Sequence, residues 1–326
     1  MKNEPNKKHH YVPVCYLKGF SENGKSLFVY NKNKNKSYSQ STKNVGCEED
    51  LYTVKDKFIA KEKMPTWDEK YFEKQFFSSG IEAEYGIQLA NIKEKATRWI
   101  LNPNKDAVLT SLEKEELSLS IVVQFLRLPE VSERFYKMYN SANRKRLDLI
   151  NAFFKAENPE WKDSMDLVQT NEDREQKAVI HAQIYTSQQL LDEGREILLK
   201  KAWGFMVSSS NDLYTSDYPI ATISQIPNQP FVFQGLGMKG AQVLFPLASN
   251  ILLSMYDVEC FDNKNFALDS FVPLTNRMRD RNNLYQYAFA NRDVYSARND
   301  FSVIVTAIKE NGGKPLNLQR PGVTVA

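Results

Sequence analysis

The sequence predicts an α+β fold, with strands and a hairpin at the N-terminus, a central helical bundle, and a C-terminal mixed antiparallel sheet with helices. Three observations predict it. Residues 1–60 are rich in short β-prone stretches, apolar residues recur every three or four positions across 67–203, and strand-like stretches return in 204–326. Strands and helices segregated in this way favour α+β over a doubly wound sheet. We expect a single large domain spanning 1–326.

The N-terminal part is expected to form a hairpin followed by a further strand. Ser26–Tyr30 is a β-prone run, and the asparagine- and lysine-rich stretch from Asn31 to Lys36 supplies a turn. Residues 37–41 then pair back on the first strand, and residues 50–54 form another short strand.

The central part is expected to consist of long helices. Ser111 is the predicted N-cap of one of them, and the acid-rich run 113–116 suits the positive end of its dipole. Pro129 ends or kinks that helix, because proline lacks the backbone N–H that a helix interior needs. The predicted helices are residues 71–101 (one or two helices), 112–128, 131–156 and 172–200.

The C-terminal part combines short apolar runs, bounded by polar turns, with one further helix. Residues 242–245 and 251–256 are expected to pair with each other across the turn between them. The predicted strands are 204–208, 220–223, 242–245, 251–256 and 293–296, and the predicted helix is 271–290.

Composition narrows the class of protein. Apolar residues make up 42% and charged residues 25% of the chain, as in an ordinary globular protein. A net charge of +3 provides no overall field for nucleic acid, so such a surface would be a local patch, with Lys7, Lys8, Lys18 and residues 31–36 as candidates. The N-terminus is polar and lysine-rich with no apolar core, so we expect no signal peptide, and no window approaches roughly eighteen uninterrupted apolar residues. The three cysteines fit no zinc spacing or disulfide framework, so we expect them to be reduced, as in the cytosol. Together with the lack of a long apolar run, this predicts a cytoplasmic protein with no membrane association.

The most informative stretch runs from Lys7 to Ser21 and carries two of the three histidines, His9 and His10. A histidine titrates near neutrality, so it can act as an acid, a base or a metal ligand. In an extended segment neighbouring side chains point to opposite faces, which places one histidine inside and one at the surface. A structural histidine bonded to a backbone carbonyl fits the same pattern.

Gln124 and Arg127 are three positions apart on a predicted helix, so they share a face. The residues around them are apolar. A guanidinium in such surroundings is costly to bury unless it meets a carboxylate or a phosphate. Arg127 is therefore either one half of a buried ion pair or a clamp for a phosphate or another anion.

Two acidic positions are further candidates. Asp217 stands two residues before Pro219 in a turn between predicted strands. Its carboxylate either satisfies the backbone of that turn or projects into a cleft. Glu82 and Glu84 are two positions apart, so only one of them can point inward, and a solvated helix surface is the simpler expectation for both.

Several catalytic signatures do not occur in the sequence. It has no phosphate-binding loop, no dinucleotide-binding fingerprint, no His-Glu-x-x-His and no Gly-x-Ser-x-Gly. A three-histidine zinc site would need every histidine, and His181 is expected in mid-helix far from the other two, which argues against zinc. The cofactor is unknown, and a divalent ion such as Mg²⁺ held by carboxylates stays open.

Taken in order, these motifs resemble the bacterial family catalogued as domain of unknown function 4238. Members often carry Ser-Asp-Asn-Pro where this chain has tyrosine at position 218, which favours a structural role for that position. The resemblance spans nearly the whole chain and rests on His10-x-x-Pro13-x-x-x-Leu17-x-x-Phe20, Asp50-Leu-Tyr52, Glu82, Gln124-x-x-Arg127, Thr215-Ser-Asp-x-Pro219, Phe245-Pro-Leu247 and residues 282–296.

The resemblance implies a role in defence against phage, because members of the family are met in bacterial phage-defence islands. We therefore expect a nuclease, acting on RNA more than on DNA. His10 would be the general acid or base, Arg127 would stabilise charge on the phosphate, and Gln124 would orient the substrate. Asp217 or Glu82 would position the histidine or hold a divalent metal.

In this interpretation His9 is a surface residue. Other functions stay open. One is a sensing module that binds a nucleotide or a phage component without catalysis of its own. Another is an enzyme that degrades or modifies a nucleotide cofactor, and a third interpretation is that the motifs only hold the fold together.

Overall fold

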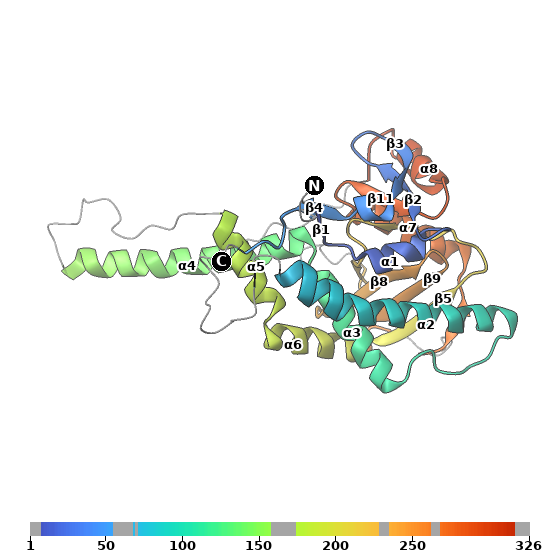
Figure 1. Cartoon of the computed structure of the whole chain (residues 1–326), viewed down its shortest axis with the longest axis horizontal. Helices are drawn as coiled ribbons and strands as arrows, with labels where there is room; N and C mark the ends of the chain where they lie inside the picture. Colours follow the sequence, from blue (N-terminus) through green and yellow to red (C-terminus); the bar gives the residue numbers. More distant parts are fainter. Residues whose placement is uncertain are drawn as a thin grey trace, which may run out of the picture.

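The chain folds into three β-sheets and a set of helices (Figure 1). The computed structural model describes residues 8–54, 68, 71–157, 174–227, 235–261 and 268–316. N-terminal strands come first, the central helices follow, and a mixed sheet with helices ends the described part of the chain. The predicted α+β class is confirmed.

The N-terminal hairpin is confirmed, but the strand after it lies earlier than predicted. β2 (Ser26–Asn31) pairs with β3 (Lys36–Ser41) in antiparallel register. The further strand is β4 (Cys47–Glu49), which pairs with β1 (Lys8–His10). Asp50 has a φ of +53°, a left-handed conformation that ends the strand where the sequence predicted one to begin. Short helical turns are α1 (Val14–Leu17), η1 (Lys18–Phe20) and η2 (Thr42–Asn44).

Two sheets bring distant parts of the chain together. In the four-stranded sheet the N-terminal hairpin continues into β11 (Asp293–Ser296) and β6 (Thr215–Ser216), in the order β3-β2-β11-β6. The five-stranded sheet has the order β10-β5-β9-β8-β7, and only β10 and β5 run parallel. The predicted pairing within 242–256 is confirmed by β8 and β9. The strands of this sheet are β5 (Ala202–Val207), β7 (Ala221–Ser224), β8 (Ala241–Ala248), β9 (Ile251–Tyr256) and β10 (Phe271–Pro273).

The first central helices follow the prediction with two differences. The N-cap of α3 (Ser111–Leu126) is Thr110 rather than Ser111, because Thr110 and Glu113 form a reciprocal capping box. The helix before Pro129 does end there, at Leu126, and Pro129 is also the first residue of the next helix, α4 (Pro129–Glu157), where a missing N–H costs no hydrogen bond. The segment before them is a π-helix, η4 (Phe72–Ile81), followed directly by α2 (Glu82–Leu101).

The later helices differ more. The single helix predicted for 172–200 is two helices, α5 (Arg174–Tyr185) and α6 (Gln188–Leu199), and residues 172–173 lie outside the described residues. Ser187 accepts a hydrogen bond from the N–H of Leu190 and so starts α6 as a new helix. The helix predicted for 271–290 is shorter, because β10 occupies its beginning and Thr275 caps α7 (Asn276–Phe289). A last helix, α8 (Ser302–Glu310), was not predicted.

One buried tyrosine joins the N-terminal segment to the C-terminal strands. The hydroxyl of Tyr16 donates to the carbonyl of Pro246 at 2.7 Å and bonds the hydroxyl of Thr215 at 2.7 Å. Its ring stacks on Phe245, with 5.3 Å between ring centroids. The largest apolar cluster accordingly mixes side chains from all three parts of the chain.

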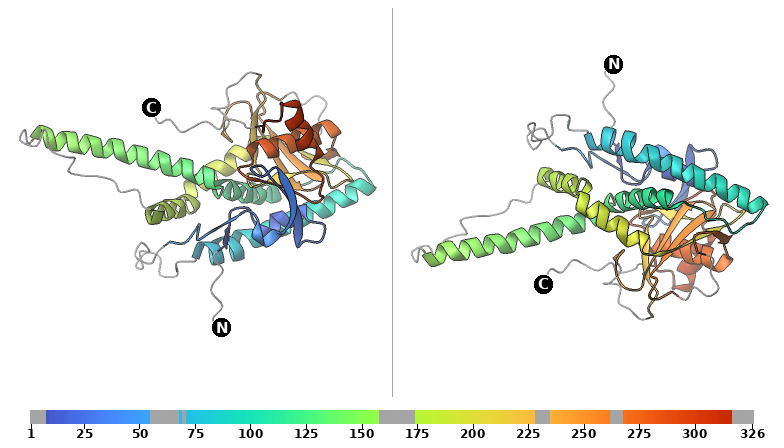
Figure 2. Two further views of the ribbon diagram at one scale, coloured as in Figure 1. Left: turned by 90° about the horizontal axis from the view of Figure 1, so that it is seen from above. Right: turned by 90° about the horizontal axis from the view of Figure 1, so that it is seen from below.

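Figures 1 and 2 show α4 projecting from the rest of the molecule as a long rod, while α2 and α3 lie against the body. Within the described part of the chain, no helix combines the length and the apolar character that a membrane span requires.

Candidate functional site

Arg127 follows the last turn of α3 and is the centre of a buried polar cluster. Only 1% of the residue is exposed. Its Nη1 donates to Glu82 Oε1 at 2.7 Å, its Nη2 donates to the backbone carbonyl of His10, and its Nε donates to the hydroxyl of Tyr52 at 3.4 Å. The guanidinium carbon lies 3.9 Å from the ring centre of Phe77. Of the two interpretations from the sequence, the buried ion pair is the one that the structure contains.

The charge of Arg127 is held by its partners. Burial alone lowers the pKa of the guanidinium, but Tyr52 and Glu82 outweigh burial, and the pKa is raised overall. All three guanidinium nitrogens donate to protein atoms, which uses three of the five guanidinium N–H groups. Because one of those atoms is the His10 carbonyl, Arg127 ties β1 to the end of α3.

His10 lies at the edge of this cluster with one free ring nitrogen. Its Nε2 is 3.2 Å from the carbonyl oxygen of Lys43, which can only accept, so Nε2 carries the proton in the neutral ring. Nδ1 has no hydrogen-bond partner among the described residues and is not among their fully enclosed atoms. Burial lowers the pKa of His10, with Glu82 acting in the opposite direction. The side chain is therefore a neutral base near pH 7.

Glu73, in the π-helix, is a member of the cluster that the sequence did not reveal. Burial raises its pKa to about 7, Arg127 lowers it, Glu82 raises it, and a hydrogen bond from the backbone N–H of His10 lowers it. Its Oε2 is enclosed and has no partner in the part of the chain that the structure describes. A carboxyl with such a pKa can give or take a proton at physiological pH. We call His10, Glu73, Glu82 and Arg127 the acid–base cluster.

The backbone form explains how two glutamates reach one arginine. A π-helix bonds residues five apart, so each turn holds more residues than an α-helical turn, and π-helical segments are frequent at functional sites. Glu73 stands near the start of η4, and Glu82 is the first residue of α2 directly after it. Both carboxylates lie close enough for Arg127 to act on them electrostatically or by hydrogen bond.

Two cationic side chains lie near the β1–β4 pair at the outer edge of the cluster. Burial raises the pKa of the half-buried Cys47 thiol, while Lys8 and Arg292 lower it and Glu73 and Glu48 raise it, so each of these groups lies within electrostatic range of Cys47, the residue paired with His10. Lys8 is exposed, and 57% of the Arg292 side chain is exposed. Unlike Arg127, these two cations face solvent.

Gln124 lies inside the protein rather than at this edge. It is 1% exposed, and its Oε1 accepts a hydrogen bond from the hydroxyl of Tyr85 at 2.8 Å. Its Nε2 has no partner among the described residues. Gln124 thus shares a helix with Arg127, but no contact with the acid–base cluster is found for its side chain.

Asp217 does not project into a cleft. It is 1% exposed, and its carboxylate accepts hydrogen bonds from the backbone N–H groups of Asn291, Arg292 and Asp293 at 2.8, 2.8 and 3.0 Å. Burial raises its pKa to about 6 against these bonds. The interpretation that the structure supports is the structural one, with one correction: the backbone that Asp217 satisfies is the distant turn before β11, not its own.

The prediction that His9 lies at the surface is wrong. His9 is fully buried, its Nδ1 accepts a hydrogen bond from the N–H of Tyr52 at 3.0 Å, and its ring stacks on that of Tyr52. The two histidines meet different partners, Tyr52 for His9 and the carbonyl of Lys43 for His10, but both are buried, at 0% and 8% exposed.

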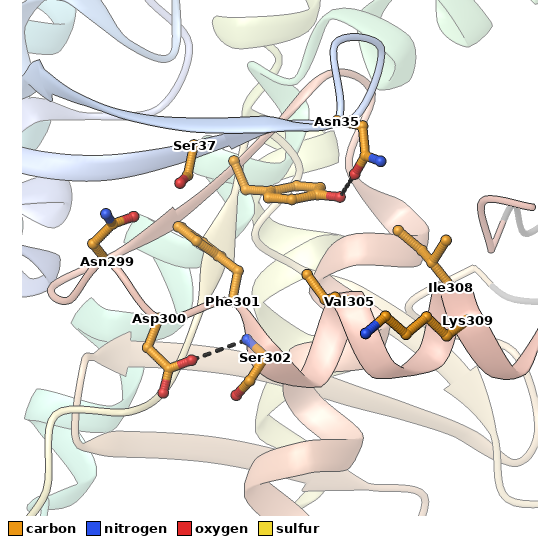
Figure 3. A pocket seen from close by; sticks show the side chains of 10 residues that line it. Asn35, Ser37, Asn299, Asp300, Phe301, Ser302, Val305, Ile308 and Lys309 are labelled. Carbon is orange, nitrogen blue, oxygen red and sulfur yellow. Dashed lines mark hydrogen bonds between the residues drawn. The ribbon is translucent and has the colours of Figure 1, made fainter. Parts of the chain in front are cut away.

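Another cavity lies away from the acid–base cluster. It has a volume of about 460 Å³ and is formed by the β2–β3 hairpin and α8, and Figure 3 shows Asn35, Phe301 and Lys309 around it. Asn35, from the run 31–36, lines it, but the candidate catalytic residues His10, Glu82, Gln124, Arg127 and Asp217 do not. No group of three or more metal-ligating side chains is found in the described ranges.

Fold and site define an α+β protein whose N-terminal strand is bound to a central helix through a buried arginine and glutamate, with titratable groups beside them. Its sequence matches the model of the family described as "Protein of unknown function (DUF4238)" over residues 8–300. The chain belongs to that family, as the resemblance implied. No curated protein and no solved structure gives a match.

Proposed function

We propose that this protein is a nuclease that cleaves RNA at the acid–base cluster, with His10 as general base and Glu73 as general acid. One observation carries the proposal. Within one cluster, an imidazole nitrogen is free to accept a proton, and an enclosed carboxyl oxygen has no partner. A neutral base beside a carboxyl that is partly protonated at neutral pH is the pairing that proton transfer in both directions requires.

The proposed reaction needs only these two proton transfers. Nδ1 of His10 takes the proton of the ribose 2′-hydroxyl as the 2′-oxygen forms a bond to phosphorus. The bond from phosphorus to the 5′-oxygen breaks, and that oxygen takes the proton of the Glu73 carboxyl. The products are a 2′,3′-cyclic phosphate and a 5′-hydroxyl, and the proton on His10 returns to Glu73 through solvent. DNA lacks the 2′-hydroxyl, which is why RNA is the favoured substrate.

In this proposal Arg127 and Glu82 position the cluster instead of touching the phosphate. Arg127 holds the His10 carbonyl and one oxygen of Glu82, so it fixes the strand that carries the base. Gln124 and Asp217 act on the fold in the same indirect way. The groups available for phosphate are the exposed Lys8 and Arg292 at the outer edge.

The test is cleavage of an end-labelled oligoribonucleotide by purified protein. His10→Ala is expected to slow cleavage by on the order of 10²–10⁴-fold, because that is the usual contribution of a general base. His9→Ala is the matched comparison, and it should lower stability more than activity, since His9 is fully buried. A single 2′-deoxy substitution at the cleaved position should block the reaction, and the cyclic phosphate should be found on the product.

The proposal fails if folded His10→Ala protein cleaves as fast as the wild type, or if the wild type cleaves no RNA with or without added Mg²⁺. The proposed setting is anti-phage defence. Expression of the wild type, but not of His10→Ala, should then reduce plaque numbers. Loss of NAD or ATP with intact RNA during infection would instead favour an enzyme that acts on a nucleotide cofactor.

A further inference from the structure

A second cavity runs along α2, and one of its lining residues, Cys15, lies within electrostatic range of Glu82 and Arg127 of the acid–base cluster. Its α2 wall is formed by Gly86, Leu89, Ala90 and Lys93, which follow Glu82 at the spacing of one helix face. The opposite wall comes from the segment of α1 and η1 and from the end of β8: Cys15, Tyr16, Lys18, Gly19, Leu247 and Ala248. We call it the α1–α2 cavity.

Gly86 keeps this cavity open. A glycine inside a helix lowers the stability of the helix by about 0.5–1 kcal/mol relative to alanine. Gly86 lies in the second turn of α2, so we expect a structural role that offsets this loss. Its φ is not positive, so the backbone does not require glycine. An added Cβ would come no closer than 3.4 Å to Cys15, so packing does not require it either. What a longer side chain would do is fill the cavity.

The lining indicates the chemistry of the ligand. The cavity has a volume of about 290 Å³, close to the lower end of small-molecule sites. Its wall is mainly apolar, and burial raises the pKa of the Cys15 thiol to about 12, so that group is uncharged. Lys18 and Lys93 are both exposed at the cavity, and neither has an ion-pair partner among the described residues. An apolar slot with two free cations suits a flat apolar group that carries a phosphate.

We propose that the α1–α2 cavity is the subsite for one base of the RNA strand, next to the phosphodiester that is cleaved at Glu73 and His10. This inference rests on the proposed function and adds to it a place for the neighbouring nucleotide. The base lies between α1 and α2, and its phosphate lies between Lys18 and Lys93. Glu82 stands one helical turn from Gly86, so the subsite and the acid–base cluster adjoin along the same helix.

The experiment fills the cavity without touching the acid–base cluster. Gly86→Leu places an isobutyl group in the cavity, and Asn91→Leu places the same group on an exposed position of the same helix. For a short oligoribonucleotide we expect KM to rise about tenfold or more in Gly86→Leu, with kcat little changed, since stacking of one base contributes on that order. Asn91→Leu should match the wild type. Thermal unfolding establishes that each variant is folded.

Charge is tested separately. Lys93→Glu should raise KM, and Lys105→Glu, an exposed lysine outside the cavity, should not. Equilibrium dialysis of adenosine 3′-monophosphate measures binding without cleavage, and Gly86→Leu should abolish it.

The outcomes separate the two proposals. If folded Gly86→Leu protein cleaves RNA at the wild-type rate with an unchanged KM, the proposed base subsite is overturned and the proposed nuclease activity is not. Binding of the mononucleotide that depends on Gly86, in a protein that cleaves no RNA, would support the cavity as a nucleotide site and overturn the nuclease.

Discussion

Replacing Glu73 by glutamine tests the electrostatics of the acid–base cluster independently of any substrate. Glutamine has the shape of a protonated glutamate but cannot ionise. In the wild type, burial raises the pKa of Glu73 to about 7 from an ordinary 4.5. A raised carboxyl pKa means that the folded state is favoured while the group is protonated. The associated stability is fully present below pH 4.5 and is lost as the pH rises through 7.

The size of the effect follows from that shift. A difference of about 2.5 pKa units at 1.36 kcal/mol per unit sets an upper limit of about 3.4 kcal/mol. Glu73 is only partly buried, and solvent screening reduces the figure by roughly a third. As the pH rises from 5 to 8, the free energy of unfolding of the wild type should therefore fall by roughly 1.5–2 kcal/mol more than that of Glu73→Gln.

Urea unfolding of both proteins at pH 5, 6, 7 and 8 measures this difference. Asp217 and His10 also titrate with shifted pKa values, but they are present in both proteins and cancel in the comparison. A wild-type-minus-variant difference that stays within roughly 0.5 kcal/mol over the whole range would refute the reasoning, because Glu73 would then titrate normally and could not serve as a general acid at neutral pH.

Two other substitutions follow from the contacts. Arg127→Met should lower the free energy of unfolding by about 3–5 kcal/mol, because it leaves the Glu82 carboxylate without its partner; urea unfolding measures it, and a loss below about 1 kcal/mol would contradict the buried ion pair. Asp217→Asn should lower the free energy of unfolding by about 1–3 kcal/mol. The amide NH₂ would face a backbone N–H group that now donates a hydrogen bond to the carboxylate, and two donors cannot bond each other. RNA cleavage by the folded Asp217→Asn protein should be nearly unchanged, and a drop as large as that expected for His10→Ala would show that Asp217 acts in the chemistry.

Local signals in the sequence predicted most of the elements, and the errors have physical causes. The hairpin of β2 and β3 and the pair of β8 and β9 are set by β-prone runs around polar turns, which a sequence displays. The break between α5 and α6 depends on a hydrogen bond from the N–H of Leu190 to Ser187, and serine is common in loops and helices alike. The pairing of β2 with β11 joins residues more than 260 positions apart, so no local sequence pattern predicts it.

The candidate site was predicted in part. An arginine among apolar residues implied an ionic partner, and Glu82 is that partner. Glu73 was missed because a single glutamate in a helix is ordinarily solvated. The sequence did contain one indication that Glu73 is buried, because Phe72 precedes it and Phe76 and Phe77 follow shortly after. Phe72 and Phe77 are both buried in the structure. His9 was misplaced because strand alternation predicts opposite faces but not whether either face reaches solvent.

The wide separation of bonded partners has a consequence for how this protein is made. Tyr16 can form its hydrogen bond only after Pro246 has been synthesised, and β2 can pair fully with β11 only after residue 296 has left the ribosome. Synthesis proceeds at roughly 5–20 residues per second, and contacts between distant residues form late in folding. A nascent chain therefore carries His10 and its partner strand β4 early, but it lacks the partners of Tyr16 and β2 on either side of them until translation is almost finished. If the protein damages RNA, that delay keeps unfinished copies from attacking the message and the ribosome that are producing them.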